Sequence, residues 1–265
     1  MRLVATDLDG TIVRADGTIS PRTVAAFEAC ATRGVDVVVV TGRPARWLGP
    51  VVEALGPRGF ALCANGAVVY DLATRRVVES QMLARDDVTT VVDTARAALG
   101  DIDVAIETLA GFRREPGYVT RWDALSDQDV GTLDALLADD PGVLKILVRQ
   151  EGSSSDAMLA SARLALEGLA QPTHSNVNDC LLEISALGVS KAASLASLVA
   201  SRGLTAGDVV AFGDMPNDVE MLRWAGRGYA MEGGHPEAVA AADAVAPACE
   251  QDGVAQVLEK LLDSA

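Results

Sequence analysis

The segment Leu3-Val4-Ala5-Thr6-Asp7-Leu8-Asp9-Gly10-Thr11 carries the strongest evidence for the fold of this chain. Its short apolar start predicts a buried strand, and two carboxylates follow just before a glycine turn. Side chains two positions apart in a strand face the same side, so Asp7 and Asp9 are expected to lie together. Two like charges on one side repel, and they need a cation, a shared proton or a chemical role. Phosphoryl transfer fits this pair, with Asp7 as nucleophile, Asp9 as acid and base, and a divalent metal beside them.

Two further apolar runs end in polar residues in the same way. Val35–Val40 leads into Thr41-Gly42, and Val209–Phe212 leads into Gly213-Asp214. Short β-branched runs bounded by glycine predict buried parallel strands.

Helical patterns separate these strands. The segment Pro21–Arg33 is one example, with Ser20 as its N-cap and Gly34 just past its end. Alternation of strands and helices predicts an α/β fold built on a doubly wound, Rossmann-like parallel sheet. Ligands bind beyond the carboxyl ends of the strands in such sheets, so the polar residues there are expected to form one site.

The middle of the chain, residues 83–187, is expected to form an inserted α+β domain between two parts of a core, residues 1–82 and 188–265. The helices expected in the insert are Asp86–Leu99, Asp127–Ala138 and Ser155–Leu169. The expected strands are Ile102–Glu107, Phe112–Arg114, Val143–Val148, a short one near Thr173, and Leu181–Ile184.

Composition restricts the partners. The formal net charge is −15 over 265 residues, which argues against a general nucleic-acid partner. Four scattered cysteines and two histidines predict neither a zinc site nor a disulfide framework. Acids interrupt the amino-terminal apolar run too early for a signal peptide, and no apolar stretch reaches the ~20 residues that span a bilayer. We expect a cytoplasmic protein with no membrane partner.

Four segments resemble the motifs of the haloacid dehalogenase superfamily. They are Asp7-Leu8-Asp9-Gly10-Thr11, Thr41-Gly42-Arg43, Lys191, and Gly213-Asp214-Met215-Pro216-Asn217-Asp218. The last motif, and the insertion between the second and third, resemble the Cof-type sugar phosphatases of subclass IIB. The resemblance spans the chain and implies a Rossmann-like core with an α+β cap that reads the substrate.

The resemblance also implies the roles of the site residues. Asp7 would form an aspartyl phosphate, and Asp9 would protonate the leaving oxygen and later activate water. A Mg²⁺ ion would be held by Asp7, the backbone carbonyl of Asp9, and Asp214. Asp218 would act through a metal-bound water or by orienting Lys191.

Phosphate oxygens would be bound by a second group of residues. These are the backbone amides of Leu8 and Gly42, together with the side chains of Thr41, Lys191 and Asn217. The alternative for Lys191 is an ordinary solvent-exposed lysine at a helix start.

The expected reaction is hydrolysis of a small phosphorylated metabolite, such as a sugar or polyol phosphate. A phosphomannomutase-like isomerase using the same aspartyl phosphate is the alternative, and a non-catalytic phosphate-binding protein is a third. A receiver domain would be about half as long, and a P-type ATPase would need membrane spans. Oligomeric state is not predicted.

Several polar residues carry weaker signals. Arg43 and Arg46 follow the second motif and could reach the site, whereas Asn65-Gly66 is first a turn signal. In the insert, three polar residues could touch substrate or belong to a polar loop: His174, Asn176 and Asn178. Five cations give the insert local positive charge that could steer a sugar phosphate: Arg113, Arg114, Arg121, Lys145 and Arg149.

Overall fold

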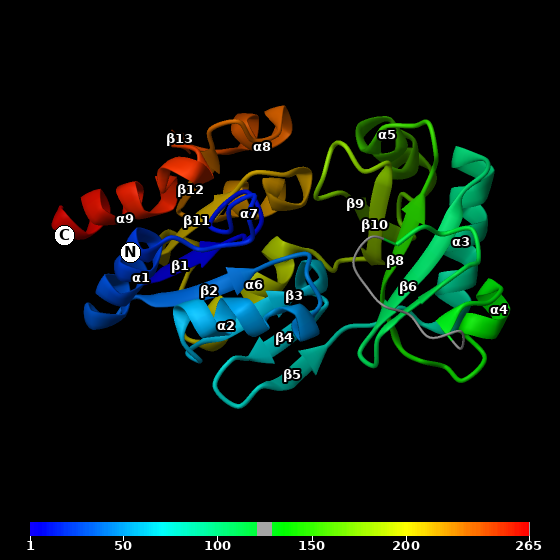
Figure 1. Ribbon diagram of the computed structural model, residues 1–265, viewed down its shortest axis with the longest axis horizontal. Helices are drawn as coiled ribbons and strands as arrows, with labels where there is room; N and C mark the ends of the chain where they lie inside the picture. The colour runs from blue at the N-terminus through cyan, green and yellow to red at the C-terminus, as the bar shows by residue number, and fades with distance from the viewer. Residues whose placement is uncertain (121–128, 265) are drawn as a thin grey trace. The chain divides into compact units, whose positions relative to one another are not determined.

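The chain forms two compact units in the computed structural model, which describes residues 1–120 and 129–264 (Figure 1). The first unit contains residues 1–79 and 190–265, and the second contains residues 80–189. Each unit has its own sheet and its own hydrophobic core.

The first unit is built on an eight-stranded sheet. Its order is β13 (Ala244–Ala246), β12 (Arg227–Met231), β11 (Val209–Gly213), β1 (Leu3–Thr6), β2 (Asp36–Val40), β3 (Phe60–Cys63), β4 (Val68–Asp71) and β5 (Arg76–Ser80). The pairs from β13 to β3 are parallel, and β4 turns back antiparallel on β3. The doubly wound parallel sheet expected from the sequence is confirmed.

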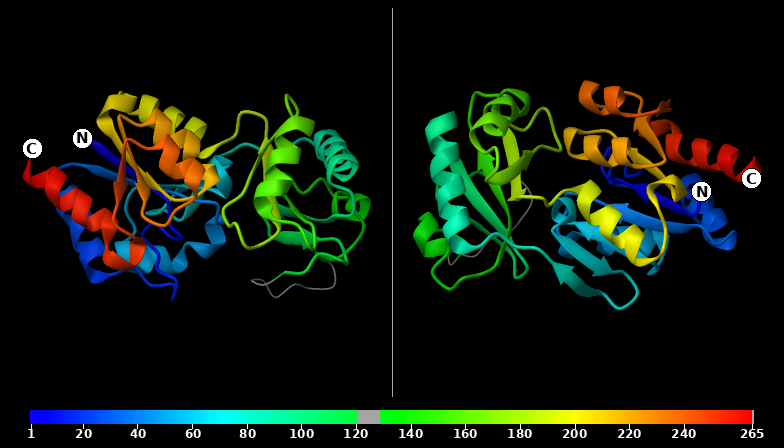
Figure 2. Two further views of the ribbon diagram at one scale, coloured as in Figure 1. Left: turned by 90° about the horizontal axis from the view of Figure 1, so that it is seen from above. Right: turned by 180° about the vertical axis from the view of Figure 1, so that it is seen from behind.

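Helices cover both faces of this sheet, which explains why its central strands are apolar throughout. They are α1 (Pro21–Thr32), α2 (Gly49–Leu55), α6 (Lys191–Ser201), α7 (Val219–Trp224), α8 (Pro236–Ala241) and α9 (Gly253–Asp263). One face, carrying Val38 and Val40, packs with α6, α7 and α8. The helices α1 and α9 lie side by side (Figure 2). No helix in the described part of the chain is long and apolar enough to cross a membrane.

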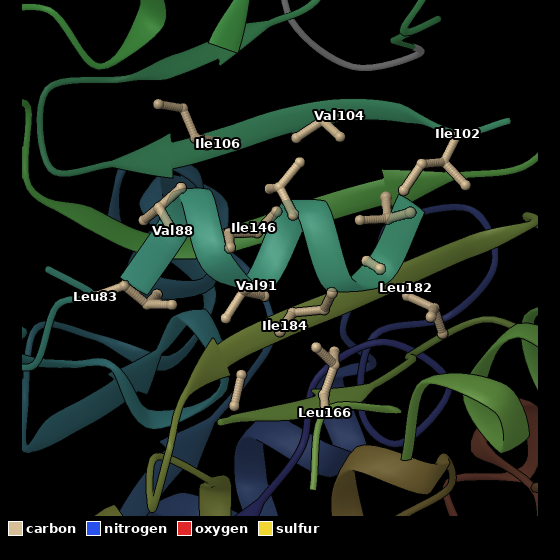
Figure 3. Packing of buried hydrophobic residues seen from close by; sticks show 14 of the residues in the cluster. Leu83, Val88, Val91, Ile102, Val104, Ile106, Ile146, Leu166, Leu182 and Ile184 are labelled. Carbon is tan, nitrogen blue, oxygen red and sulfur yellow. The ribbon is translucent and has the colours of Figure 1, made fainter. Parts of the chain in front are cut away.

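The second unit is built on an antiparallel sheet. Its order is β7 (Phe112–Arg114), β6 (Asp103–Thr108), β8 (Val143–Arg149), β10 (Leu181–Ala186) and β9 (Ala170–Thr173). Its helices are α3 (Arg85–Leu99), α4 (Leu133–Leu136) and α5 (Ser155–Ala165). Apolar side chains of α3, such as Val88 and Val91, pack on Ile106, Ile146 and Ile184 of the strands (Figure 3).

One expected helix of the insert is wrong in its described part. The sequence predicts a helix over Asp127–Ala138, but α4 begins only at Leu133, with Thr132 as its N-cap. Val130 forms a parallel bridge with Arg114 instead, so tertiary pairing overrides the local helical pattern. Residues 127 and 128 lie outside the described residues. The helix expected to reach Leu169 ends at Ala165.

Candidate active site

Two acidic residues of the site follow neighbouring parallel strands and lie at one edge of the first sheet. β1 ends at Thr6, directly before Asp7, and β11 ends at Gly213, directly before Asp214. These two strands pair in parallel, so the two carboxylates lie at the same sheet edge. Thr41 follows β2, the other neighbour of β1. The carboxyl ends of adjacent strands therefore bring together residues that are far apart in sequence.

Lys191 is the first residue of α6 and lies inside the protein. The Ser190 hydroxyl caps the helix by accepting a hydrogen bond from the Ala193 amide at 3.2 Å. The Lys191 side chain is 1% exposed, which excludes the solvent-exposed lysine considered from the sequence. Its Nζ lies 2.6 Å from Asp7 Oδ1 and 2.7 Å from Asp218 Oδ1. One ammonium thus bridges two carboxylates.

Asp218 organises the loop after β11. Its Oδ2 accepts hydrogen bonds from the backbone amides of Asp214 and Met215, both at 3.0 Å. A Cβ on Gly213 would lie 2.4 Å from the Asp218 carboxyl carbon, so the turn needs glycine there. The side chain is fully buried, with one oxygen on Lys191 and the other on the loop. Asp218 therefore holds both the Lys191 side chain and the backbone of Asp214 in place.

Burial and like charge act together on the acids of the site. Burial raises the pKa of Asp7, the Lys191 ammonium opposes this rise, and Asp218 and Asp9 add to it. Burial also raises the pKa of Asp214, and the charges of Asp7 and Asp218 raise it further. Burial lowers the pKa of Lys191, but Asp218 and Asp7 outweigh burial and the net shift is upward. The site holds more negative charge than its lysine neutralises.

The donor set fits a hard divalent cation. Carboxylate oxygens of Asp7, Asp214 and Asp218 lie within 4.8 Å of one another, and all three residues are buried. Three carboxylates stand against the single ammonium of Lys191, so the group is short of positive charge. An ion that takes oxygen ligands would supply that charge. Thr11 contributes a hydroxyl 3.3 Å from Asp214 Oδ1.

The Asp9 carboxylate lies apart from this acidic cluster and is bound by Arg43. The Arg43 guanidinium donates to both Asp9 oxygens, with Nε 2.8 Å from Oδ2. The hydrogen bond to Asp9 raises the pKa of Arg43. The Asp9 side chain is 60% exposed, in contrast to the buried Asp7. Arg43 therefore joins the site, as its place after the second motif suggested.

The remaining predicted residues line the same edge of the sheet. Thr41 is buried, and its hydroxyl accepts from the Arg43 amide at 3.1 Å. Gly42 follows it in a bend. Leu8 is buried in the core, and its carbonyl accepts the amides of Ile12 at 2.9 Å and Val13 at 2.7 Å. These bonds fix the turn that follows Asp7.

Asn217 and Asn65 form a contact that the motifs did not indicate. Asn217 Nδ2 donates to Asn65 Oδ1 at 3.1 Å, while Asn217 Oδ1 is buried and has no hydrogen-bond partner among residues 1–120 and 129–264. Asn65 has φ 57°, in the left-handed region that Asn tolerates better than most residues. The sequence signal was present as Asn65-Gly66, but it predicted only a turn. The role of Thr11 beside Asp214 was likewise not predicted, because a short polar side chain in a turn has many ordinary uses.

Comparisons with known proteins identify the family of the chain. The family model described as haloacid dehalogenase-like hydrolase matches residues 4–258. The 5-amino-6-(5-phospho-D-ribitylamino)uracil phosphatase YcsE of Bacillus subtilis (strain 168) is 27% identical over 259 residues, covering 97% of this chain and 94% of that protein. The HMP-PP phosphatase of Serratia proteamaculans (strain 568) is 26% identical over 285 residues, covering 99% and 96%.

A solved structure shows the same fold. The subclass IIB sugar phosphatase BT4131 matches with a TM-score of 0.78 and 18% identity, covering 98% of this chain and 99% of that one. The family match extends over nearly the whole sequence. Three of the four motifs directly follow β1, β2 and β11, and the remaining one, Lys191, begins α6. The chain therefore belongs to the haloacid dehalogenase-like hydrolases, and the expected enzyme class, a hydrolase of the phosphatase type in that family, is confirmed.

Proposed function

We propose that this enzyme is a Mg²⁺-dependent phosphatase that hydrolyses small phosphomonoesters, sugar phosphates among them, through an aspartyl phosphate. The observation that carries the proposal is the buried Asp7 carboxylate, held at 2.6 Å by Lys191 beside Asp214 and Asp218. A carboxylate fixed in this way is oriented to attack and has a cation nearby for the charge on phosphate. The names of the relatives as phosphatases support the same reaction.

Asp7 and Asp9 divide the reaction into two half-reactions. In the first, an Asp7 oxygen bonds to phosphorus as the bond from phosphorus to the leaving oxygen breaks, and Asp9 gives that oxygen a proton. In the second, Asp9 takes a proton from water as the water oxygen attacks phosphorus and the Asp7–phosphorus bond breaks. Asp7 and protonated Asp9 are regenerated, and inorganic phosphate is released.

The other residues of the site would bind the phosphate group and hold the catalytic side chains in place. Lys191 and the Thr41 hydroxyl would contact phosphate oxygens, and Asn217 and the backbone amides of Leu8 and Gly42 would complete that cradle. Asp218 would hold Lys191 in place. Mg²⁺, bound by Asp7, the Asp9 carbonyl and Asp214, would offset negative charge on the phosphate and the acids.

The two parts of the chain would have different roles in this reaction. Residues 1–82 and 188–265 would carry the chemistry, and residues 83–187 would act as a cap that selects the leaving group. The expected partner is a small phosphorylated metabolite rather than a nucleic acid, because the formal charge of −15 opposes a polyanion. The expected setting is the cytoplasm.

The test is release of inorganic phosphate from sugar and nucleotide monophosphates with Mg²⁺ and with a chelator, using Asp7→Asn as the control. We expect metal-dependent release by the wild type and none by the folded variant. Release by Asp7→Asn at the wild-type rate would overturn the nucleophile. Isomerisation of a hexose phosphate that requires a hexose bisphosphate, without phosphate release, would instead establish the mutase.

A further inference from the structure

The loop between β1 and α1, residues 7–20, carries Asp9 and begins with a tight turn. The Leu8 carbonyl accepts the Val13 amide at 2.7 Å, and the Gly10 amide donates to the Val13 carbonyl at 3.1 Å. These hydrogen bonds tie both ends of the turn together, so its residues have little freedom to move separately. A displacement of the chain at the end of the turn would therefore also displace Asp9.

The same turn lies directly against Asp214, the acid that follows β11. A Cβ on Gly10 would lie 2.5 Å from Asp214 Oδ2, and the Thr11 hydroxyl lies 3.3 Å from Asp214 Oδ1. Asp214 is one of the proposed Mg²⁺ ligands. The position of this turn therefore affects both Asp9 and the surroundings of the proposed metal site.

Arg14 fixes the end of the turn to the segment that precedes α9. Its Nη2 lies 2.7 Å from Asp252 Oδ1, and its Nε lies 3.9 Å from Glu250 Oε2. Glu250 also accepts a hydrogen bond from the Ala15 amide at 3.0 Å. The side chains of Arg14 and Asp252 are 27% and 19% exposed, so solvent screens their interaction only in part. We call Arg14, Glu250 and Asp252 the loop anchor.

The segment that receives Arg14 is itself held in one conformation. Asp252 precedes the first residue of α9, and a Cβ on that residue, Gly253, would overlap the Pro247 carbonyl oxygen. A hydrogen bond from the Ser20 hydroxyl and the charge of Arg14 lower the pKa of Asp252. Ser20 is the last residue of the loop, so one carboxylate binds the loop at its middle and at its end.

We propose that Arg14 and Asp252 are positioning residues for Asp9, and that the loop anchor holds Asp9 where it exchanges protons with the leaving oxygen and with water. This inference rests on the proposed phosphatase function. Proton transfer requires heavy atoms about 2.6–3.2 Å apart, and a misplacement of about 1 Å caused by a distant mutation can lower a rate about 10²-fold. Arg14 and Asp252 act through the backbone of the loop and take no part in the bond changes.

The test measures phosphate release by full-length Arg14→Gln and Asp252→Asn in Mg²⁺, from the sugar or nucleotide monophosphate that the wild type hydrolyses fastest. Each change removes the charge of one partner and keeps a polar side chain. We expect kcat to fall about 10- to 100-fold and KM to change less than about threefold, because Asp9 acts in the chemical steps. Arg14→Lys still offers Asp252 a cation and should retain most of kcat.

A second ion pair between neighbouring parts of the chain provides the matched control. Arg22 of α1 donates to both carboxylate oxygens of Glu259 in α9, at 2.8 and 2.6 Å, and it lies outside the loop. Arg22→Gln makes the same change as Arg14→Gln and should leave kcat unchanged. Thermal unfolding would verify that each variant is folded at the assay temperature. An equal loss of kcat in both variants would assign the loss to general destabilisation and overturn the inference.

A double-mutant cycle shows whether Arg14 acts through Asp9. In Asp9→Asn the proton-transfer group is absent, so the position of the loop no longer limits proton transfer. Adding Arg14→Gln to this variant should lower kcat by less than about threefold, because the two residues serve the same step. A loss as large as in the wild-type background would show that Arg14 acts independently of Asp9, and the inference would be wrong.

Failure of the inference can be told apart from failure of the proposed function. Phosphate release by Arg14→Gln and Asp252→Asn at the wild-type kcat would reject the positioning role and leave the proposed phosphatase intact. No release by the folded wild type from any sugar or nucleotide monophosphate would remove the proposed function, and this inference with it.

Discussion

Lys191 shows how much depends on the environment of a single residue. A lysine at a helix start is usually solvated, but this one is 1% exposed between Asp7 and Asp218. Removing a charge from water is costly, and here two carboxylates offset that cost. Lys191, itself held by Asp218, also positions the proposed nucleophile, Asp7. Stability and chemistry are therefore coupled at this residue.

Replacing Lys191 by Met should destabilise the protein strongly. The change leaves two buried carboxylates without their shared cation, and breaking a buried pair in this way costs about 3–5 kcal/mol. Urea unfolding would measure the loss. The matched control, Lys260→Met on the exposed surface of α9, should change stability by less than about 0.5 kcal/mol. Equal effects of the two changes would mean that the buried contacts contribute nothing measurable.

Replacing Asp9 by Asn should lower kcat about 10²–10⁴-fold, because the amide can neither donate the proton to the leaving oxygen nor take one from water. Steady-state kinetics with Mg²⁺ would show the loss, and circular dichroism would verify folding. Asp16→Asn changes an exposed carboxylate in a loop and should leave kcat unchanged. A wild-type kcat for Asp9→Asn would remove Asp9 from the mechanism.

The ends of secondary-structure elements position the site. β1 and β11 end directly before Asp7 and Asp214, so both acids lie at one sheet edge. α6 begins at Lys191 because Ser190 caps it. A cap fixes both the first turn of a helix and the direction in which the first side chain leaves it. Local hydrogen bonds at element ends therefore set distances between residues that are far apart in sequence.

The N-caps of α6 and α5 provide a matched pair for testing this coupling. Ser190 and Ser154 each accept an amide hydrogen bond at 3.2 Å. Replacing either by Ala should lower stability by about 1 kcal/mol in urea unfolding. Only Ser190→Ala should also reduce kcat, because only that cap adjoins Lys191. An equal loss of kcat in both variants would show a general effect of destabilisation.

Charge is distributed unevenly over the whole molecule. The formal net charge is −15, yet its buried acids are largely gathered with cations in two places, around Lys191 in the first unit and Lys145 in the second. In the first group the carboxylates of Asp7, Asp214 and Asp218 outnumber the Lys191 ammonium, and burial together with like charge raises the pKa values of Asp7 and Asp214. Proton and metal binding at that group should therefore affect the stability of the whole protein.

The stabilisation by Mg²⁺ should grow as pH rises. Asp7 and Asp214 have folded-state pKa values above the ordinary value of 3.8, so the folded protein binds more protons than the unfolded chain, and stability without metal falls as pH rises from there through the raised values. Mg²⁺ competes with those protons, so its binding strengthens over the same interval.

Thermal unfolding with Mg²⁺ and with a chelator at about pH 5 and about pH 8 would measure this linkage. The gain in Tm from Mg²⁺ should be small at the lower pH and larger at the higher pH. Asp214→Asn should reduce the gain at the higher pH, and Asp139→Asn, which alters an exposed acid of the second unit, should not. A gain that is equal at both pH values would contradict the metal site.

Local sequence patterns correctly predicted the strands with continuous β-branched runs and the helix with a clear N-cap. The β-branched runs became β1, β2 and β11, and Ser20 caps α1 as expected. The helix expected over Asp127–Ala138 failed because Val130 pairs with Arg114, a contact that no local pattern encodes. Apolar periodicity indicates which side of a segment is buried, but it does not identify the segment that packs against that side.

Local sequence patterns were enough to predict the fold class and the kinds of side chain at the strand ends, because strand patterns, caps and motif residues are local properties. Tertiary structure decided which of those groups meet. Lys191 contacts Asp7 across 184 residues, Asn217 contacts Asn65 across 152, and Lys145 meets Glu183 across 38. Such contacts depend on the pairing order of strands and on burial. Burial then turns ordinary acids and lysines into interacting groups with altered pKa values, because water no longer screens them.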